Sequence, residues 1–253
     1  MPLVLVEKQT PQITLITLNR PERRNALTIE LMSALSSAIE NAAADEIQRV
    51  LILRGAGSAF CTGLDLNEAA EMHKAHASAE MVAKTLVTLS QTRLITIAAV
   101  HGAALAGGAG IMSACDFVIA AERTKVGYPE VRRGLVAGLV MTFLRRQVRE
   151  RDLRELLLTS ELIDAKRAQE IGLVNRVVPP NELENAAKNI AAAILQGAPG
   201  AIAHSKRLIE ELWSSSVAED VAVALRHHMA ARESDEAKEG IAAFLEKRSP
   251  NWL

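Results

Sequence analysis

Aromatic residues are scarce in this chain, since Phe, Trp and Tyr together make up 3% of its 253 residues. Its core must therefore be built from Ala, Leu, Ile and Val, within a hydrophobic content of 49%. No apolar run approaches the roughly 20 residues that a membrane-spanning helix needs. An excess of either charge is also absent, because 29 basic residues face 30 acidic ones. This balance predicts neither a nucleic acid nor an anionic membrane as a partner.

Cysteine is rare as well, with only Cys61 and Cys115 in the chain. Two cysteines fit a reducing compartment, and residues 1–8, which include Glu7, show no signal or transit pattern. We therefore expect a cytoplasmic location. Cys61 is expected to be a small buried apolar side chain, because no histidine stands near it in the sequence. The histidines do not show the spacing of zinc ligands, so no metal site is predicted. The sequence also shows no Ser-His-Asp pattern of a nucleophilic enzyme.

The hydrophobic pattern predicts an α/β chain that ends in helices. A hairpin is expected from residues 4–7 and 13–18, and Thr28 and Asp164 are typical N-caps for helices over 28–44 and 165–171. Further strands are expected at 50–53, 94–100, 117–120 and 173–178, and further helices at 67–91, 139–158, 182–195, 201–213, 217–233 and 235–246. We divide the chain into an α/β core, residues 1–195, and a helical region, residues 196–253.

The most informative stretch joins the expected strand at 94–100 to an expected helix at 111–115. It contains Gly102, Gly107, Gly108 and Gly110, whose spacing does not fit a dinucleotide-binding loop, and the Lys and Ser/Thr of a phosphate-binding loop are missing. Glycines between a strand and a helix leave backbone N–H groups bare along the helix dipole. Such groups can stabilise an oxyanion, although the same glycines would also serve close packing of helix on strand.

A second glycine turn, around Gly63, follows the expected strand at 50–53 and precedes another helix. The two turns together offer backbone N–H groups from Leu64 and Gly107. An oxyanion hole normally needs two convergent donors of this kind. The pair of turns therefore favours an oxyanion site over simple packing.

At this point the chain resembles the crotonase family, the enoyl-CoA hydratases and isomerases, over nearly its whole length. The segments that carry the resemblance are Leu18-Asn19-Arg20-Pro21-Glu22-Arg23-Arg24-Asn25-Ala26-Leu27, Phe60-Cys61-Thr62-Gly63-Leu64-Asp65-Leu66, the glycine segment with Cys115-Asp116, Gly127-Tyr128-Pro129-Glu130-Val131 with Gly134-Leu135, Leu158-Thr159-Ser160, Ala165 with Ala168, Gly172-Leu173-Val174-Asn175 and Phe244-Leu245-Glu246-Lys247-Arg248-Ser249-Pro250. Each segment alone is weak, but their order and spacing together are highly specific.

The resemblance implies a spiral of β-β-α turns followed by a helical region that packs between subunits, in a homo-trimer or a dimer of trimers. It implies an acyl-CoA thioester substrate, with coenzyme A as part of the substrate and no separate cofactor. The thioester oxygen would lie between the N–H groups of Leu64 and Gly107, and Glu130 would be the catalytic acid/base. The residues that would bind the substrate and its CoA part are Arg23, Arg24, Ala26, Thr62, Gly63, Asp65, Leu66, Gly108, Gly110, Phe244 and Lys247. Asp65 is expected to order its turn and not to carry protons.

One departure from the family pattern concerns the acid/base supply. The family's hydratases have two glutamates, and this chain keeps one as Glu130 but has Gly110 at the other position. One carboxylate can shuttle a proton between two carbons more readily than it can also align a water. Gly110 therefore favours an isomerase, or a hydratase-like enzyme with an altered acid/base supply, over a classical hydratase. Alternatives stay open: thioester hydrolysis, decarboxylation, C–C cleavage, or a non-catalytic acyl-CoA-binding subunit.

Two further departures lie close to Glu130 in the sequence. Arg133 stands where the family often has an apolar residue, which raises the choice between binding a substrate carboxylate and forming a surface or subunit ion pair. Leu139, Val140 and Met141 stand where the family often has small residues. These larger side chains are expected to narrow or reshape the acyl pocket.

Overall fold

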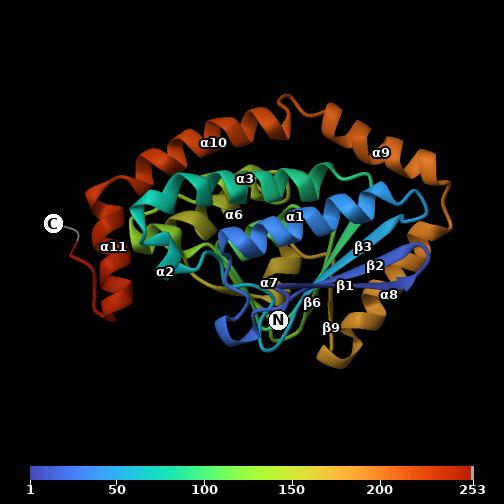
Figure 1. Ribbon diagram of the computed structural model, residues 1–253, viewed down its shortest axis with the longest axis horizontal. Coiled ribbons are helices and arrows are strands. Elements are labelled where there is room, and N and C mark those ends of the chain that lie inside the picture. Colours follow the sequence, from blue (N-terminus) through green and yellow to red (C-terminus); the bar gives the residue numbers. More distant parts are fainter. Residues whose placement is uncertain (252–253) are drawn as a thin grey trace.

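The computed structural model describes residues 1–251, apart from the side chain of Met72. Its main sheet is central to the molecule (Figure 1). The strands of this sheet, in spatial order, are β1 (Val4–Thr10), β2 (Ile13–Leu18), β3 (Val50–Gly55), β4 (Ile95–Val100), β6 (Phe117–Ala121) and β9 (Arg176–Val178). The predicted hairpin is confirmed, because β1 and β2 pair antiparallel, and every other neighbouring pair is parallel.

A second, smaller sheet was not predicted from the sequence. It consists of β5 (Ala103–Leu105), β7 (Lys125–Gly127) and β8 (Ile163–Asp164). The expectation that the glycine segment leads directly from β4 into a helix at Ile111 is wrong in two respects. The short strand β5 lies in between, and helix α4 (Gly107–Ser113) already begins at Gly107. A strand of three residues is too short to show a period of two, which is why the pattern did not reveal it.

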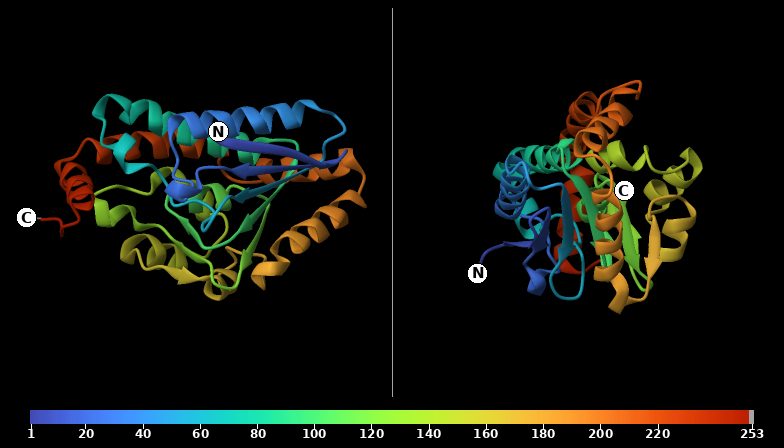
Figure 2. Two further views of the ribbon diagram at one scale, coloured as in Figure 1. Left: turned by 60° about the horizontal axis from the view of Figure 1, so that its bottom comes forward. Right: turned by 90° about the vertical axis from the view of Figure 1, so that its right-hand side faces the viewer.

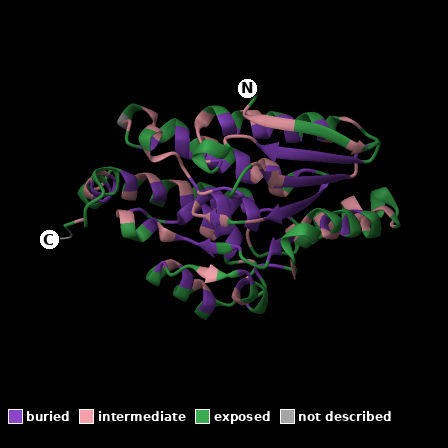
Figure 3. Ribbon diagram, turned by 90° about the horizontal axis from the view of Figure 1, so that it is seen from below, coloured by how far each residue is buried: buried purple, intermediate pink, exposed green. Residues whose placement is uncertain are grey.

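Helices cover both faces of the main sheet (Figure 2). Helices α1 (Ile29–Ala44) and α3 (Ala75–Gln91) pack together on one face, and α8 (Leu183–Leu195) packs on the other. Along β3 the side chains alternate between these faces, as the geometry of a strand requires: Leu51 and Leu53 enter one apolar cluster, and Val50 and Ile52 the other. Figure 3 shows that the central strands are buried almost throughout.

Local signals placed several helix ends correctly. The hydroxyl of Thr28 accepts a hydrogen bond from the N–H of Leu31, and the Asp164 carboxylate accepts one from the N–H of Arg167, so both predicted N-caps are confirmed. The strand expected at 173–178 is shorter, because only β9 pairs with β6. The remaining elements are η1 (Pro21–Arg23), α2 (Leu66–Ala69), η2 (Met72–Lys74), η3 (Pro129–Arg133), α5 (Gly138–Leu144), α6 (Glu150–Arg154), η4 (Glu155–Thr159), α7 (Ala165–Glu170) and η5 (Pro180–Glu182).

The C-terminal helices α9 (Pro199–Glu211), α10 (Val217–Arg232) and α11 (Asp235–Glu246) run across one side of the molecule (Figure 1). Helix α10 packs on α3 and α5, and α11 packs on η3. None of the helices within residues 1–251 is long and apolar enough to cross a membrane.

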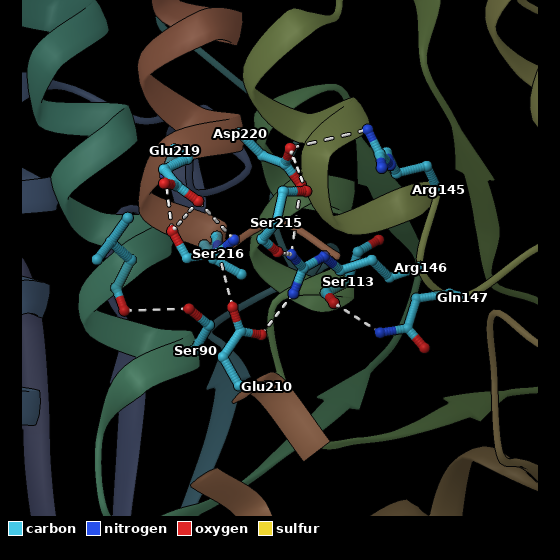
Figure 4. Close-up of polar contacts among 12 residues, drawn as sticks. Ser90, Ser113, Arg145, Arg146, Gln147, Glu210, Ser215, Ser216, Glu219 and Asp220 are labelled. Carbon is cyan, nitrogen blue, oxygen red and sulfur yellow. Dashed lines mark hydrogen bonds and ion pairs between the residues drawn. The ribbon is translucent and has the colours of Figure 1, made fainter. Parts of the chain in front are cut away.

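The junction between α9 and α10 is attached to the core by Arg146 (Figure 4). This guanidinium pairs with Glu210, donates to the carbonyl of Ser215 at 2.9 Å and contacts Asp220 at 3.3 Å. It also lies 4.9 Å from the centroid of the Trp213 ring. Because the network holds the start of α10 against the end of α5, it helps to place α10 and α11 beside the segments that carry the expected site residues.

Candidate active site

A cavity of about 380 Å³ opens between η1, the turn before α2, the start of α4, η3, α5 and the two last helices. Most of the residues expected to bind substrate line it, although they come from distant parts of the chain. The sequence-predicted residues among its lining are Arg23, Arg24, Ala26, Thr62, Leu64, Asp65, Leu66, Gly107, Glu130 and Phe244. Four others, Gly63, Gly108, Gly110 and Lys247, do not belong to the lining.

The backbone N–H groups of Leu64 and Gly107 are both free to bind a ligand. Around the first turn the chain uses the neighbouring groups instead: Leu27 donates to the carbonyl of Gly63, and Asp65 donates to the carbonyl of Leu27, both at 2.8 Å. Gly107 is the first residue of α4, where an N–H has no partner within the helix. Among the hydrogen bonds of the described residues, none uses either N–H.

The two glycine turns lie in direct contact. A Cβ atom on Gly63 would stand 2.8 Å from the Cβ of Ala106 and 3.3 Å from the backbone nitrogen of Gly107. Gly63 also has a φ of 89°, which L side chains rarely adopt. Gly63 therefore serves the close approach of the two turns and does not line the cavity itself.

Ala106 holds a strained backbone conformation just before Gly107, with φ 48° and ψ −123°. Its N–H donates to the carbonyl of Gly127 at 2.9 Å, and its carbonyl accepts from Gly110 at the same distance. A non-glycine residue in such a region costs of the order of 1–3 kcal/mol, and strain of this kind clusters at functional sites. Here the strained peptide directly precedes the free N–H of Gly107.

Asp65 orders the first turn, as the sequence indicated. Its carboxylate accepts from the N–H of Asn67 at 3.1 Å and from the Arg20 guanidinium at 2.9 Å. Burial opposes ionisation of Asp65, but these two hydrogen bonds hold its pKa below the usual range. Arg20 also donates to the carbonyl of Ala26 at 2.7 Å, and the buried side chain of Asn25 donates to the carbonyl of Ala59 at 2.8 Å. Arg20 and Asn25 belong to the first motif, but sequence reasoning gave them no role.

Glu130 is buried, with 9% of its surface exposed, and its Oε2 atom has no hydrogen-bond partner. It lies on η3 directly after Pro129, and it lines the cavity together with Leu64 and Gly107. Burial raises the pKa of Glu130 to about 7, against the opposing effects of its own backbone N–H and the nearby Arg133. Glu130 is therefore not a solvated carboxylate on a surface turn.

Gly110 and Val140 occupy complementary positions. A Cβ on Gly110 would stand 2.3 Å from Cγ1 of Val140 and 3.0 Å from its Cβ. The valine thus fills the volume next to the position where the hydratases carry their other glutamate. Two departures from the family pattern that are thirty positions apart in the sequence are one packing arrangement in space.

This arrangement predicts strong coupling between the two positions. Gly110→Ala alone overpacks the site, which destabilises the fold by about 1–3 kcal/mol. The better helix propensity of alanine offsets about 1 kcal/mol of this loss. Val140→Ala alone leaves a void. In the double variant the new methyl group enters that void, so its loss of unfolding free energy is about 1–2 kcal/mol smaller than the sum of the single losses. Urea unfolding of the four proteins measures this, and simple additivity would contradict the packing account.

Both cysteines are buried away from solvent. Burial raises the pKa of the Cys61 thiol to about 12 and raises that of Cys115 as well. A thiol in this state is a poor nucleophile, so the interpretation of Cys61 as an apolar filler is confirmed. The cavity also contains a residue that sequence reasoning missed, His228 of α10. It lies about a hundred positions after Glu130, and no local pattern connects the two.

Comparisons with known proteins identify the family of this chain. A family model described as enoyl-CoA hydratase/isomerase matches residues 8–253. An enoyl-CoA hydratase from Mycobacterium avium has 33% identity and a TM-score of 0.87, with 100% of both chains covered. A carnitinyl-CoA hydratase from the same species has 32% identity and the same TM-score, covering 100% of this chain and 98% of that one. A mevalonyl-coenzyme A hydratase from Aspergillus fumigatus is 34% identical over 98% of this chain and 94% of its own length.

The family match spans nearly the whole sequence, and the structural likeness extends over the complete fold, including the C-terminal helices. The free N–H groups, the buried carboxyl group and the cavity that they share all come from segments within the matched region. The chain is a member of the enoyl-CoA hydratase/isomerase family, with the crotonase fold.

Proposed function

We propose that this protein converts enoyl-CoA thioesters, with Leu64 and Gly107 as a backbone oxyanion hole and Glu130 as the acid/base. The observation that carries the proposal is that two residues with unused backbone N–H groups, Leu64 and Gly107, line one cavity together with Glu130, whose Oε2 has no partner. Donors aimed at a developing oxyanion contribute several kcal/mol of transition-state stabilisation. A carboxyl group with a pKa near 7 can both take and return a proton close to neutral pH.

The reaction that this set of groups supports best is the shift of a double bond. The Glu130 carboxylate removes a proton from C2 of a 3-enoyl thioester, and the electron pair moves toward the thioester oxygen. The N–H groups of Leu64 and Gly107 stabilise the resulting dienolate. The protonated Glu130 then delivers the same proton to C4, which yields the 2-enoyl thioester and restores the carboxylate. No water has to be held in this sequence, so one carboxyl group is sufficient.

The Gly110–Val140 packing is what favours isomerisation over hydration in this proposal. Hydration needs a water aligned for attack as well as a proton delivered to the neighbouring carbon. A second carboxylate at position 110 has no room beside Val140. Hydration of 2-enoyl-CoA by this chain is therefore expected to be much slower than its isomerisation of 3-enoyl-CoA.

The CoA part of the substrate is assigned to the mouth of the cavity. Phe244 lines the part of the cavity beside Arg133, whereas the guanidinium groups of Arg23 and Arg24, which also line the cavity, match the charge of the CoA phosphates. Lys247 follows the end of α11 in a left-handed conformation, and we assign it to the same phosphates. CoA enters as part of the substrate, and no separate cofactor is invoked.

The direct test is turnover by the purified protein of 3-hexenoyl-CoA and of crotonyl-CoA. The proposal expects isomerisation of the first and little or no hydration of the second. Hydration that equals isomerisation would contradict the role given to Gly110. If the protein instead hydrolyses, decarboxylates or cleaves other acyl-CoA esters, the same oxyanion hole serves a different reaction. Tight binding without any turnover would support a non-catalytic subunit.

The raised pKa of Glu130 predicts the pH dependence of this reaction. The base is the carboxylate, so kcat/KM is constant above pH 7 and falls about tenfold per pH unit below it. The inflection is expected near the pKa of about 7. A pH–rate profile of 3-hexenoyl-CoA isomerisation measures it. A profile that stays flat down to the usual glutamate range would show that Glu130 is not the base.

We also propose that the protein assembles as a trimer or a dimer of trimers. Support comes from large apolar side chains that a single chain leaves exposed at and just after α9, namely Leu208, Ile209, Leu212 and Trp213. Exposed apolar side chains in such a cluster are typical of a protein–protein interface. Light scattering coupled to gel filtration distinguishes a monomer from three or six copies.

A further inference from the structure

Several buried polar atoms in the cavity have no partner within the protein. Across the described residues, five buried side-chain atoms lack a hydrogen bond, and three of them belong to the cavity lining: Oε2 of Glu130, Nε of Arg133 and Nε2 of His228. Buried polar groups are almost always hydrogen-bonded, and an exception calls for an explanation. Glu130 is explained by the proton transfer proposed above. Arg133 is not, because that reaction has no use for a second charged group.

The Arg133 guanidinium is held in place but not neutralised. It lies 4.6 Å from the centroid of the Phe244 ring, and its Nη1 donates to the carbonyl of Pro129 at 3.3 Å. Helix α11 fits closely against its backbone, since a Cβ on Gly240 would stand 2.4 Å from the Arg133 carbonyl carbon. In the described part of the chain, none of the ion pairs within 4.0 Å includes Arg133.

The other titratable groups of the cavity leave this positive charge available. Glu130, three residues earlier on η3, is the nearest carboxyl group in sequence, but it forms no ion pair with Arg133, and its Oε2 has no partner. The Nδ1 of His228 lies 3.2 Å from the carbonyl of Val136, which can only accept a hydrogen bond. Its Nε2 is then an acceptor in the neutral ring, and such an atom repels an anion. Arg133 is therefore the group in this part of the cavity that suits a carboxylate.

We propose that Arg133 binds a carboxylate at the far end of the acyl group, so that the preferred substrates are CoA monothioesters of short dicarboxylic acids. The guanidinium presents several donors in a fixed plane and binds a carboxylate through two of them. Glu130 and Arg133 are one turn of 3₁₀ helix apart, a rise of about 6 Å. That separation corresponds to a few carbon–carbon bonds, and so the carboxylate belongs a few carbons beyond the reacting position. This inference rests on the acyl-CoA site of the proposed function.

Binding of two saturated analogues that the enzyme cannot turn over tests the inference. Glutaryl-CoA carries the terminal carboxylate, and butyryl-CoA lacks it. Wild-type protein is expected to bind glutaryl-CoA more tightly, and Arg133→Met is expected to lose about 30- to 1,000-fold in affinity for it with less than about threefold change for butyryl-CoA. Arg133→Lys keeps the positive charge but lacks the planar pair of N–H donors, so its affinity for glutaryl-CoA is expected to lie between those of the wild type and Arg133→Met. Arg132→Met, at the exposed neighbouring arginine, serves as the matched control and retains the wild-type preference.

The ratio of two affinities on one variant cancels any general loss of folded protein. Equal affinity of the wild type for both analogues would overturn the inference. If Arg133→Met lost affinity equally for both analogues and for free CoA, the inference would also be overturned, and Arg133 would be placed at the CoA phosphates. The proposed function is judged separately, by turnover of 3-hexenoyl-CoA. A wild type that fails there but prefers glutaryl-CoA refutes the isomerase and retains the carboxylate site.

Discussion

The Glu130→Gln enzyme loses about 10²- to 10⁴-fold in kcat for the isomerisation of 3-enoyl-CoA, because a positioned general acid/base contributes an effect of that size. Glutamine has the same shape as glutamate but can neither take the proton from C2 nor return it at C4. The substrate still reaches the N–H groups of Leu64 and Gly107, so KM changes little. Steady-state kinetics of purified wild type and variant measure both parameters. Activity that survives the substitution would remove Glu130 from the reaction.

The same substitution is expected to raise the stability of the fold while it lowers activity. A loss of activity can therefore be distinguished from misfolding. The pKa of Glu130 is about 7 in the folded protein and 4.5 for an ordinary glutamate, so between these values the folded state binds more protons and stability falls as pH rises. The amide that replaces the carboxyl group cannot ionise, and at about pH 8 the variant is more stable than wild type by up to about 3 kcal/mol. Glu122→Gln, at an exposed position after β6, is the matched control and changes neither kcat nor stability.

The Gly63→Ala enzyme loses about 10²- to 10³-fold in kcat/KM, the usual effect of removing one oxyanion-hole donor. The added methyl group would meet the Cβ of Ala106 at 2.8 Å and the nitrogen of Gly107 at 3.3 Å. The two turns must therefore move apart, and their N–H groups no longer reach one oxygen. Because φ at this position is 89°, the alanine also stores of the order of 1–3 kcal/mol of backbone strain, which thermal unfolding detects as a lower Tm.

The control for this variant is a glycine with open space around it. A Cβ on Gly200, in the first turn of α9, has no atom within 4 Å. Gly200→Ala therefore retains full kcat/KM and is stabilised by up to about 1 kcal/mol. Retention of wild-type kcat/KM by Gly63→Ala, within about threefold, would mean that the contact between the two turns does not control the reaction.

Local signals in the sequence were enough to place most of the elements. The caps at Thr28 and Asp164 lie where the residue types indicated, and the C-terminal helices end within a few residues of their expected limits. The second sheet was missed, because β5, β7 and β8 are too short to show periodicity. The sequence predicted that helix α4 begins at Ile111, but it begins at Gly107. Glycines have a low helix propensity, so the pattern did not indicate a helix that tertiary packing imposes.

Motifs in the sequence named candidate site residues but not their surroundings. Leu64, Gly107 and Glu130 were named from the sequence, and all three line one cavity. The burial of Glu130, the contact between Gly110 and Val140, and the position of Arg133 against Phe244 depend on packing between segments far apart in the chain. Such contacts leave no local pattern, so the raised pKa of Glu130 and the unpartnered Nε of Arg133 appear only in three dimensions.

The proposed reaction depends on two main-chain N–H groups that converge on the oxygen of a thioester. A crystal structure of the Glu130→Gln protein with a bound 3-enoyl-CoA would show whether they do. The thioester oxygen is expected at about 2.7–3.1 Å from the nitrogens of both Leu64 and Gly107. A thioester oxygen bound elsewhere, or either N–H engaged by another part of the protein in that complex, would contradict it.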